Sequence, residues 1–432
     1  MAHRDHDPVD GTVGRDLWER ADAVLPGGGV YWSRSADMAG RGVLPGFIAA
    51  NSGCRVTDAD GREYIDFLCA NGPNLLGYRH PEVEAAADAM RAQITTASLF
   101  PPALVEVVER IIATWSAPES PLDWGVVAKN GSEVVSLGAR VARQHTQRNR
   151  IVAFTGAYHG NDPQLAVAPP AGALTDLTGD VHRLPWNGAD ELVDHAALHG
   201  DDIAGILLNP LDQRPGASTV TPCPDFLDAI KAVRDRHGVL LIFDDVRHGF
   251  RLHPAGSHRP LGLRPDLVAL GKALGNGHSI SALLGTDEVR RAARRIMFTS
   301  TYMFEAPPMA AAIATLEVYE RDDAFAHITA MGERLRSGLE ESARTTGHSV
   351  IVSGPPTMPT LLFADDHDAT AARAFARAAA GEGVIFHPFL NWFLSAAHTS
   401  ADIDAAVEAA RAAFAATPTS GVQPSRSDNA RR

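Results

Sequence analysis

Lys272 is the residue of this sequence whose type and surroundings point most clearly to catalysis. It stands in LVALGKALGNGHSISALLG, where an apolar run ends and small residues follow. A lysine that is partly removed from water has a lowered pKa, and its amine can then attack a carbonyl to form an imine. A Walker loop is not indicated, because Ala273 follows the lysine and Asp266 stands where that motif has its first glycine. The pattern favours an imine-forming lysine at the end of a strand.

Two adjacent carboxylates, Asp244 and Asp245, directly follow the apolar run LLIF. Burying such a pair at the end of a strand costs free energy unless a cation lies nearby. A metal ion, an arginine or a protonated ring nitrogen would each serve, and capping of a helix is the plainer alternative.

The segment Lys129-Asn130-Gly131-Ser132-Glu133 lies between an apolar run and an amphipathic stretch. We expect Ser132 to cap the helix that begins there, and Gly131 to let a ligand approach the backbone closely. Free N–H groups and the dipole of that helix would favour a phosphate. An ordinary capped loop is the alternative.

These three places together suit a single ligand. A phosphate near Gly131, a carboxylate at Asp244 for a ring nitrogen and an imine-forming Lys272 match the chemical handles of pyridoxal phosphate. An anion beside the pyridine nitrogen keeps it protonated, so the ring withdraws electrons from the carbon that loses its proton. Tyr158, in the segment YHG after another apolar run, could stack on that ring.

Short apolar runs alternate with longer amphipathic stretches in the middle of the chain, and they predict the elements that position these residues. Continuous apolar runs of this length are typical of strands buried on both faces, in a parallel or mixed sheet covered by helices. We therefore expect an α/β fold. The predicted strands are residues 124–128, 151–154, 203–208, 239–243, 267–270 and 280–284, and the predicted helices between them are residues 132–145, 190–198 and 225–237.

A smaller α+β unit is expected from the two ends of the chain. Residues 54–68 are typical of a hairpin with Asp60-Gly61 as its turn. Beyond about residue 305 we expect helices at 308–319, 325–346 and 401–416, with strands at 359–363 and 383–386. The predicted division is residues 1–60 as a segment that packs with the small domain, 61–304 as the large cofactor-binding domain, 305–416 as the small domain and 417–432 as a disordered tail.

The composition argues against several classes of function. The chain has 432 residues, a formal net charge of −13 and no block rich in Lys and Arg, so neither nucleic acid nor an anionic membrane is an expected partner. Three scattered cysteines predict no disulfide framework and no cysteine-rich zinc site. His195 and His199 have the spacing of metal ligands, but a solvated helix face explains them better, and no metal is predicted. Without a signal peptide or a long apolar run, a cytoplasmic enzyme is expected.

The sequence resembles the class III aminotransferases, pyridoxal phosphate enzymes of fold type I, and within them the glutamate-1-semialdehyde aminomutase branch. The resemblance runs from about residue 15 to about residue 415. The family's phosphate loop corresponds to Asn130-Gly131-Ser132, and its aromatic–His–Gly element corresponds to Tyr158-His159-Gly160. Its Asp-Glu-Val motif begins at Asp244, and Lys272 falls where the family has its Schiff-base lysine, 28 residues later.

The resemblance implies how a large domain with a mostly parallel sheet would hold the cofactor. Tyr158 and Val246 would enclose the ring, with Asn130 and His159 beside them in the cofactor site. Gly131 and Ser132 would hold the phosphate together with Thr301, which this family lends to the neighbouring subunit. A homodimer with shared active sites is therefore expected.

Departures from the family pattern concentrate where substrate would bind. Asn209 stands where the family usually has a glutamate, Arg247-His248 replaces a small or polar pair, and Leu390 takes the place of a carboxylate of the aminomutases. These changes favour an aminotransferase over an aminomutase, which remains the alternative.

The resemblance also suggests substrates. We expect an amino donor such as L-glutamate and a keto acceptor, for which a cyclic ketone of secondary metabolism is one candidate. Arg34 would bind a substrate carboxylate, and Trp32 and Trp392 would wall the pocket, although buried aromatics are more often plain core. A ligand-binding protein without turnover is disfavoured, because Lys272 and Asp244 are both retained.

Overall fold

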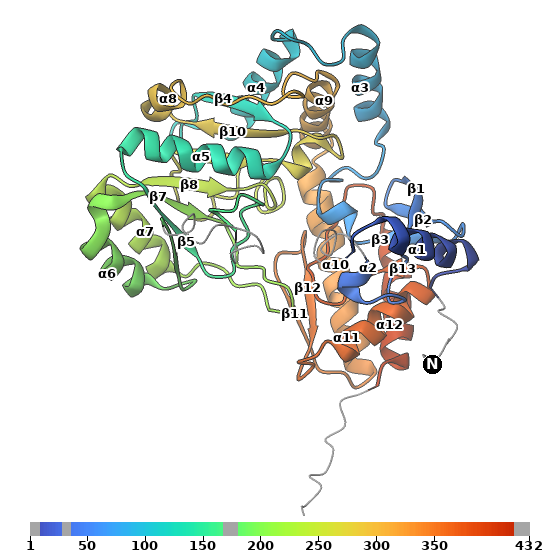
Figure 1. Ribbon diagram of the computed structural model, residues 1–432. Coiled ribbons are helices and arrows are strands. Elements are labelled where there is room, and N and C mark those ends of the chain that lie inside the picture. The colour runs from blue at the N-terminus through green and yellow to red at the C-terminus, as the bar shows by residue number, and fades with distance from the viewer. Residues whose placement is uncertain (1–8, 28–35, 167–179, 419–432) are drawn as a thin grey trace, which may run out of the picture.

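The computed structural model of the chain describes residues 9–27, 36–166 and 180–418. A seven-stranded sheet forms the centre of its larger half (Figure 1), in the order β4-β10-β9-β8-β7-β5-β6. Neighbouring strands are parallel, except that β10 runs antiparallel to both β4 and β9. The strands are β4 (Trp124–Ala128), β5 (Arg150–Phe154), β6 (Val181–Leu184), β7 (Ile203–Leu208), β8 (Leu240–Asp244), β9 (Leu267–Leu270) and β10 (Ser281–Gly285). The predicted mostly parallel sheet is confirmed, with β6 as an addition.

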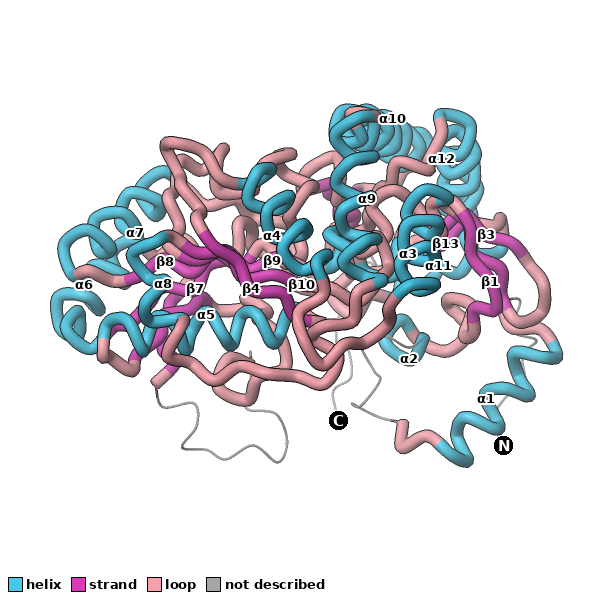
Figure 2. The backbone as a smooth tube through the Cα atoms, turned by 90° about the horizontal axis from the view of Figure 1, so that it is seen from above, coloured by secondary structure: helices cyan, strands magenta, loops and turns pink. Residues whose placement is uncertain are grey.

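Helices cover both faces of this sheet, which explains why its strands are apolar throughout. In β8, Leu240 and Ile242 pack in the cluster that contains α5, whereas Leu241 and Phe243 pack in the cluster that contains α4 and α7. Figure 2 shows α5 running along one side of the sheet. The helices of this half are α4 (Pro102–Trp115), α5 (Gly131–Thr146), α6 (Ala189–His199), α7 (Pro224–His237) and α8 (Asp287–Ala293).

The second half joins the two ends of the chain in one sheet. Its strand order is β1-β2-β3-β13, and β13 (Val384–Ile385) pairs in parallel with β3 (Glu63–Asp66). The predicted hairpin is confirmed, because β2 (Arg55–Asp58) pairs antiparallel with β3 and Gly61 in the turn has a φ of +85°. The remaining elements are α1 (Thr12–Val24), α2 (Ala36–Ala39), β1 (Ile48–Ser52), α10 (Ala324–Thr345), β11 (Val350–Ser353), β12 (Thr360–Phe363), α11 (Thr370–Gly381) and α12 (Ser400–Ala416).

Two helices connect the halves. The helix α3 (Pro81–Gln93) packs against α9 (Pro307–Arg321), and α9 leads into α10 of the second half (Figure 1). Proline stands in the first turn of both, where its missing N–H costs no hydrogen bond. The domain boundaries drawn from the sequence stay a prediction. Within the described residues, no helix has the length and apolar character needed to cross a membrane.

Candidate active site

Four predicted site residues and Asn209 lie at one edge of the seven-stranded sheet. The strands β4, β5, β7, β8 and β9 point the same way, so their carboxyl ends meet at that edge. Asn130, His159, Asn209, Asp244 and Lys272 follow or end these strands in turn. Ligands of open α/β sheets bind at this edge. The fold therefore assembles the site from segments that are far apart in the sequence.

Asp244 is buried, and His159 meets it. The His159 Nδ1 lies 2.7 Å from the Asp244 Oδ2, and both side chains are almost fully removed from solvent. The backbone N–H of Val246 donates to the other carboxylate oxygen over 3.2 Å. The Nε2 of His159 is buried with no hydrogen-bond partner in the described part of the chain. The neighbour that a buried carboxylate requires is thus a histidine.

The helix α5 begins with a capping box at the candidate phosphate site. The side chain of Asn130 accepts from the N–H of Glu133 over 3.1 Å, and Glu133 accepts from the N–H of Asn130 over 3.2 Å. The expectation that Ser132 caps this helix is wrong. Its hydroxyl accepts from the N–H of Asn161 over 3.0 Å instead. Among the described residues, the N–H groups of Gly131 and Ser132 have no acceptor and can receive a phosphate.

Close backbone approach explains the glycines around this helix end. A Cβ on Gly131 would lie 2.6 Å from a methyl group of Val246, and a Cβ on Gly160 would lie 2.4 Å from the Ser132 hydroxyl. Gly160 also has a φ of +98°, which favours glycine. The backbone at Gly131 therefore lies close to Val246, and the backbone at Gly160 lies close to Ser132.

Lys272 opens a short 3-10 turn, η5 (Lys272–Gly275), directly after β9. Its φ is +43°, an uncommon conformation for a residue with a side chain. The turn is anchored by Asn276, whose side chain accepts from the N–H of Leu76 over 2.8 Å and donates to the carbonyl of Gly77 over 3.0 Å. Lys272 is half-buried, as expected for an amine that must meet a ligand.

Tyr158 and Thr301 are more exposed than the core of the site. The Tyr158 side chain is 59% exposed, and its hydroxyl donates to the Asn161 side chain over 2.9 Å. Burial and, to a smaller extent, the charge of Asp244 raise the pKa of Tyr158. Thr301 lies in an exposed turn. Trp32 and Arg34 lie outside the described residues.

Two titratable residues that follow Asp244 are also buried but have other surroundings. Asp245 is buried and accepts from the N–H of Ser257 over 2.9 Å, and its other oxygen has no partner in the described chain. Burial raises the pKa of Asp245 to about 7. His248 is buried as well, and burial, with the nearby charges of Arg247 and Lys272, lowers its pKa. Asp244 is thus the carboxylate of the pair that meets His159.

Trp392 belongs to the core of the second half. It is 1% exposed, stacks on Phe386 with ring centroids 4.2 Å apart, and donates its indole N–H to the carbonyl of His387. The plain-core interpretation of this residue is therefore correct, and it does not wall a pocket.

Pyridoxal phosphate fits the residues at the sheet edge. The two free N–H groups at the start of α5 suit its phosphate, the buried Asp244 suits a protonated ring nitrogen, and Lys272 supplies an amine. Within the described residues, no group of three or more His, Cys, Asp or Glu side chains is arranged to hold a metal ion. The N–H groups, the carboxylate and the amine at this edge together suit an organic phosphate.

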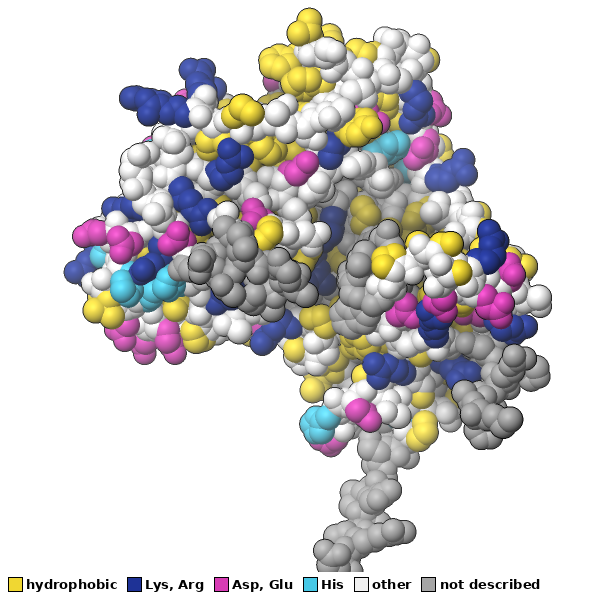
Figure 3. All heavy atoms as spheres, viewed as in Figure 1, with side chains coloured by type: hydrophobic (Ala, Val, Ile, Leu, Met, Phe, Trp, Pro, Cys, Tyr) yellow, Lys and Arg dark blue, Asp and Glu magenta, His cyan; other side chains and the backbone are white. Residues whose placement is uncertain are grey.

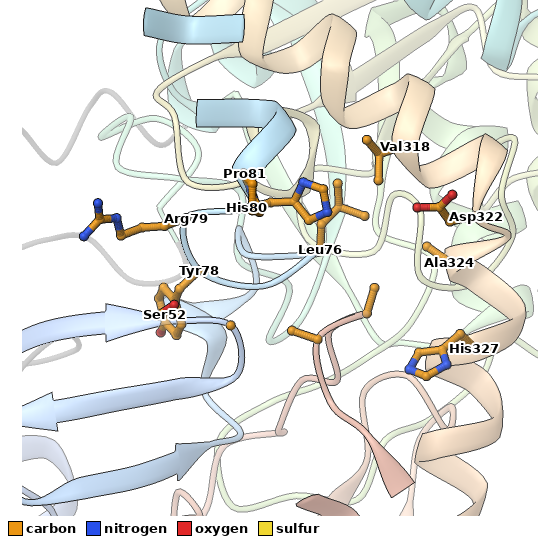
Figure 4. Close-up of a pocket in the computed structure, with 13 residues that line it drawn as sticks. Ser52, Leu76, Tyr78, Arg79, His80, Pro81, Val318, Asp322, Ala324 and His327 are labelled. Carbon is orange, nitrogen blue, oxygen red and sulfur yellow. The ribbon is translucent and has the colours of Figure 1, made fainter. Parts of the chain in front are cut away.

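A separate cavity of about 470 Å³ lies between the halves (Figure 4). Tyr78, Arg79 and His80 line it from the turn before α3. Asp322, directly after α9, and His327 of α10 line the other side. None of the predicted site residues contributes to its wall, so it is distinct from the site at the sheet edge.

Comparisons with known proteins identify the family of the chain. The family model described as aminotransferase class-III matches residues 38–413. An aminopentol aminotransferase from Sphingopyxis macrogoltabida is 39% identical over 408 residues, which cover 94% of this chain and 95% of the relative. A glutamate-1-semialdehyde 2,1-aminomutase from Thermomicrobium roseum is 32% identical over 425 residues, which cover 92% of this chain and 97% of the relative.

A solved structure shows the same fold. The FumI protein of Sphingopyxis sp. MTA144, in its PLP internal aldimine form, superposes with a TM-score of 0.88 at 38% identity, covering 94% of this chain and 96% of that one. The match extends over both halves of the molecule, as does the family model. The chain therefore belongs to the class III aminotransferases, and it is a fold type I aminotransferase whose cofactor is pyridoxal phosphate.

Proposed function

We propose that Lys272, Asp244 and the start of α5 form the cofactor site of this aminotransferase, as expected from the sequence. The observation that carries the proposal is the half-buried Lys272 at the same sheet edge as the buried Asp244–His159 pair. Asn130, Gly131 and Ser132 would hold the phosphate, and Tyr158 and Val246 would lie on the two faces of the ring. His159 would orient Asp244.

The proposed chemistry divides between the cofactor and the chain. When bound, pyridoxal phosphate supplies an aldehyde that reacts with amines and a protonated ring that withdraws electrons. Asp244 would keep the proton on the ring nitrogen, because a buried carboxylate favours a cation beside it. Lys272 would hold the aldehyde group when no substrate is bound, and its free amine would carry the proton that the donor's α-carbon loses to the carbon of that aldehyde group.

We propose transfer between two molecules, from an amino acid such as L-glutamate to a keto acceptor, over an amino shift within one molecule. Asn209, in place of the usual glutamate, is buried and donates its amide to the carbonyl of Asp244 over 3.5 Å. Leu390 is half-buried and apolar where the aminomutases have a carboxylate. Two negative charges that would stabilise a doubly aminated intermediate are thereby lost. For the acceptor, a ketone of secondary metabolism, such as a cyclic ketone, remains the proposal.

We further propose a homodimer with shared sites. Leu99, Phe100 and Tyr302 have side chains 82%, 74% and 61% exposed. Their segments lie side by side, because the N–H of Ala97 donates to the carbonyl of Phe304. Figure 3 shows hydrophobic side chains at the top of the molecule, over the connection between α3 and α4. Such an exposed apolar patch favours contact with a partner surface, and Thr301 lies next to it in the sequence.

We also propose that the protein works in the cytoplasm, because its three cysteines are free, as is usual in a reducing compartment.

The test of intermolecular transfer uses L-glutamate without an acceptor. The holoenzyme should change its absorbance to that of the pyridoxamine form and release one equivalent of 2-oxoglutarate per site. An unchanged spectrum, together with catalytic isomerisation of glutamate-1-semialdehyde, would establish the aminomutase instead. Lys272→Ala, incubated in the same way, is the control for release that does not depend on the site.

A further inference from the structure

Arg247 is a cation at the edge of the candidate active site that the cofactor roles leave unassigned. It follows Val246, whose methyl groups pack against Gly131 and approach Gly271, the residue before Lys272. Its backbone is therefore one residue away from the surface on which the ring would lie. Figure 3 shows Lys and Arg side chains in the hollow between the two halves of the molecule.

The guanidinium of Arg247 is fixed by neutral acceptors from both halves. One terminal nitrogen donates to the carbonyl of Gln213 over 3.2 Å, and the other donates to the side-chain oxygen of Asn391. Gln213 follows β7 in the large half, whereas Asn391 belongs to the second half after β13. The side chain is half-buried, so its remaining donors can be reached by a ligand.

The positive charge of Arg247 is not neutralised within the described residues, where it forms no ion pair with a carboxylate. The two acidic residues next to it in the sequence do not pair with it: Asp244 pairs with His159, and Asp245 accepts from the N–H of Ser257. Asp212, which precedes Gln213, pairs with Arg214 over 2.9 Å. Burial lowers the pKa of Arg247 to about 10, which still leaves the group charged at neutral pH.

The neighbouring Arg251 shows what a structural arginine looks like in this fold. It is 1% exposed, and its two terminal nitrogens donate to the carbonyls of Leu394 and Gly72 over 2.7 and 3.0 Å. Its guanidinium is sealed between the halves. Arg247 differs because it is partly accessible and donates to Asn391, the residue after Leu390.

We propose that Arg247 binds the α-carboxylate of the amino acid substrate. An anion at this point would neutralise the guanidinium and accept hydrogen bonds from the N–H groups that do not donate to Gln213 or Asn391. Arginine pairs with carboxylates in a planar, bidentate geometry. The two neutral acceptors then serve to hold the guanidinium in place. The inference rests on the proposed aminotransferase function and specifies which part of its substrate is recognised.

The test compares donors that differ in the carboxylate alone. Propan-2-amine is L-alanine with a methyl group in place of the carboxylate, and L-glutamate adds a second carboxylate. Single-turnover absorbance changes of the holoenzyme give a rate and an apparent dissociation constant for each donor. Arg247→Gln should weaken the binding of L-alanine and of L-glutamate equally, by about 10–100-fold, because each loses a hydrogen bond between charged groups. Arg247→Lys should recover part of this loss because it keeps the charge.

Propan-2-amine is the control donor, because it forms every interaction of L-alanine except those of the carboxylate. Its reaction should change less than about threefold in Arg247→Gln, which also shows that the variant is folded and holds its cofactor. Arg214→Gln is the matched control, because it removes a nearby arginine that already has Asp212 as its partner. With this variant, the rate and the apparent dissociation constant for each of the three donors should change less than about threefold. An equal loss for amine and amino acids would mean that Arg247 only joins the halves, and a loss for L-glutamate alone would place the side-chain carboxylate there. Either result overturns the inference, whereas a wild-type enzyme inert to all three donors would overturn the proposed function.

Discussion

The Nδ1 of His159 lies 2.7 Å from the Oδ2 of Asp244, in a place where both side chains are sealed from solvent. The two residues are 85 positions apart and follow or end strands that are separated in the sheet by β7. This contact fixes the orientation of the carboxylate. In the proposed site, this is the carboxylate that holds the proton on the cofactor ring.

Removing His159 should expose the cost of burying Asp244. His159→Leu leaves the carboxylate with the Val246 N–H as its partner, and we expect the free energy of unfolding to fall by about 3–5 kcal/mol, with reduced cofactor content. His159→Gln, which keeps a donor, should lose less. Denaturant unfolding of the single variants and of His159→Leu with Asp244→Asn measures the coupling. If the double variant loses the sum of the single losses, the two side chains do not stabilise each other.

Asp245 should make the protein less stable as the pH rises. Burial raises its pKa from 3.8 to about 7 in the folded state, so between these values the folded chain holds a proton that the unfolded chain has released. The free energy of unfolding contributed by this group therefore falls with pH across that window, by up to about 1.4 kcal/mol per pH unit, and is constant above it.

Asp245→Asn should remove this slope. The gain in thermal midpoint over the wild type should grow from pH 4 to pH 7 and then level off, because the amide cannot ionise. Asp404→Asn, at an exposed carboxylate paired with Arg334, is the matched control and should show no such trend. A gain that is the same at every pH would mean that Asp245 is already ionised throughout.

Thr301 should matter for cofactor retention in the proposed dimer. Thr301→Ala should weaken cofactor binding by about 1–3 kcal/mol, the range for losing a hydrogen bond to a charged group. Equilibrium dialysis measures the dissociation constant, and sedimentation measures the assembly. Thr345→Ala, at an exposed threonine of α10, should behave as wild type. A monomer with full cofactor occupancy would contradict both the dimer and the shared site.

Lys272→Ala should abolish turnover and leave the chain folded. The side chain is half-buried at the edge of the sheet and adds little to the core, so the thermal midpoint of the apoprotein should stay close to wild type. Lys231→Ala, at an exposed lysine paired with Asp228 on α7, should keep full activity. More than a few percent of residual activity in Lys272→Ala would remove this lysine from the chemistry.

The sequence predicts β8 and β9, and with them Asp244 and Lys272, because strands buried on both faces are apolar throughout. It misses β6 for the opposite reason: this edge strand is half-buried along its length and has no apolar run. The capping role of Asn130 was visible in principle, since Glu133 stands three residues later, as a capping box requires. The contacts of His159 with Asp244 and of Arg247 with Asn391 join distant segments, and periodicity carries no information about such pairs.

The most direct measurement of the central claim is the position of the cofactor on the chain. The sequence contains three lysines, Lys129, Lys231 and Lys272, so reduction of the holoenzyme with borohydride followed by peptide mass spectrometry has few possible outcomes. We expect the yellow colour to bleach and a pyridoxyl group to appear on Lys272 alone. A pyridoxyl group on Lys129 or Lys231, or a reduced protein with no modified lysine, would contradict the assignment of the active site.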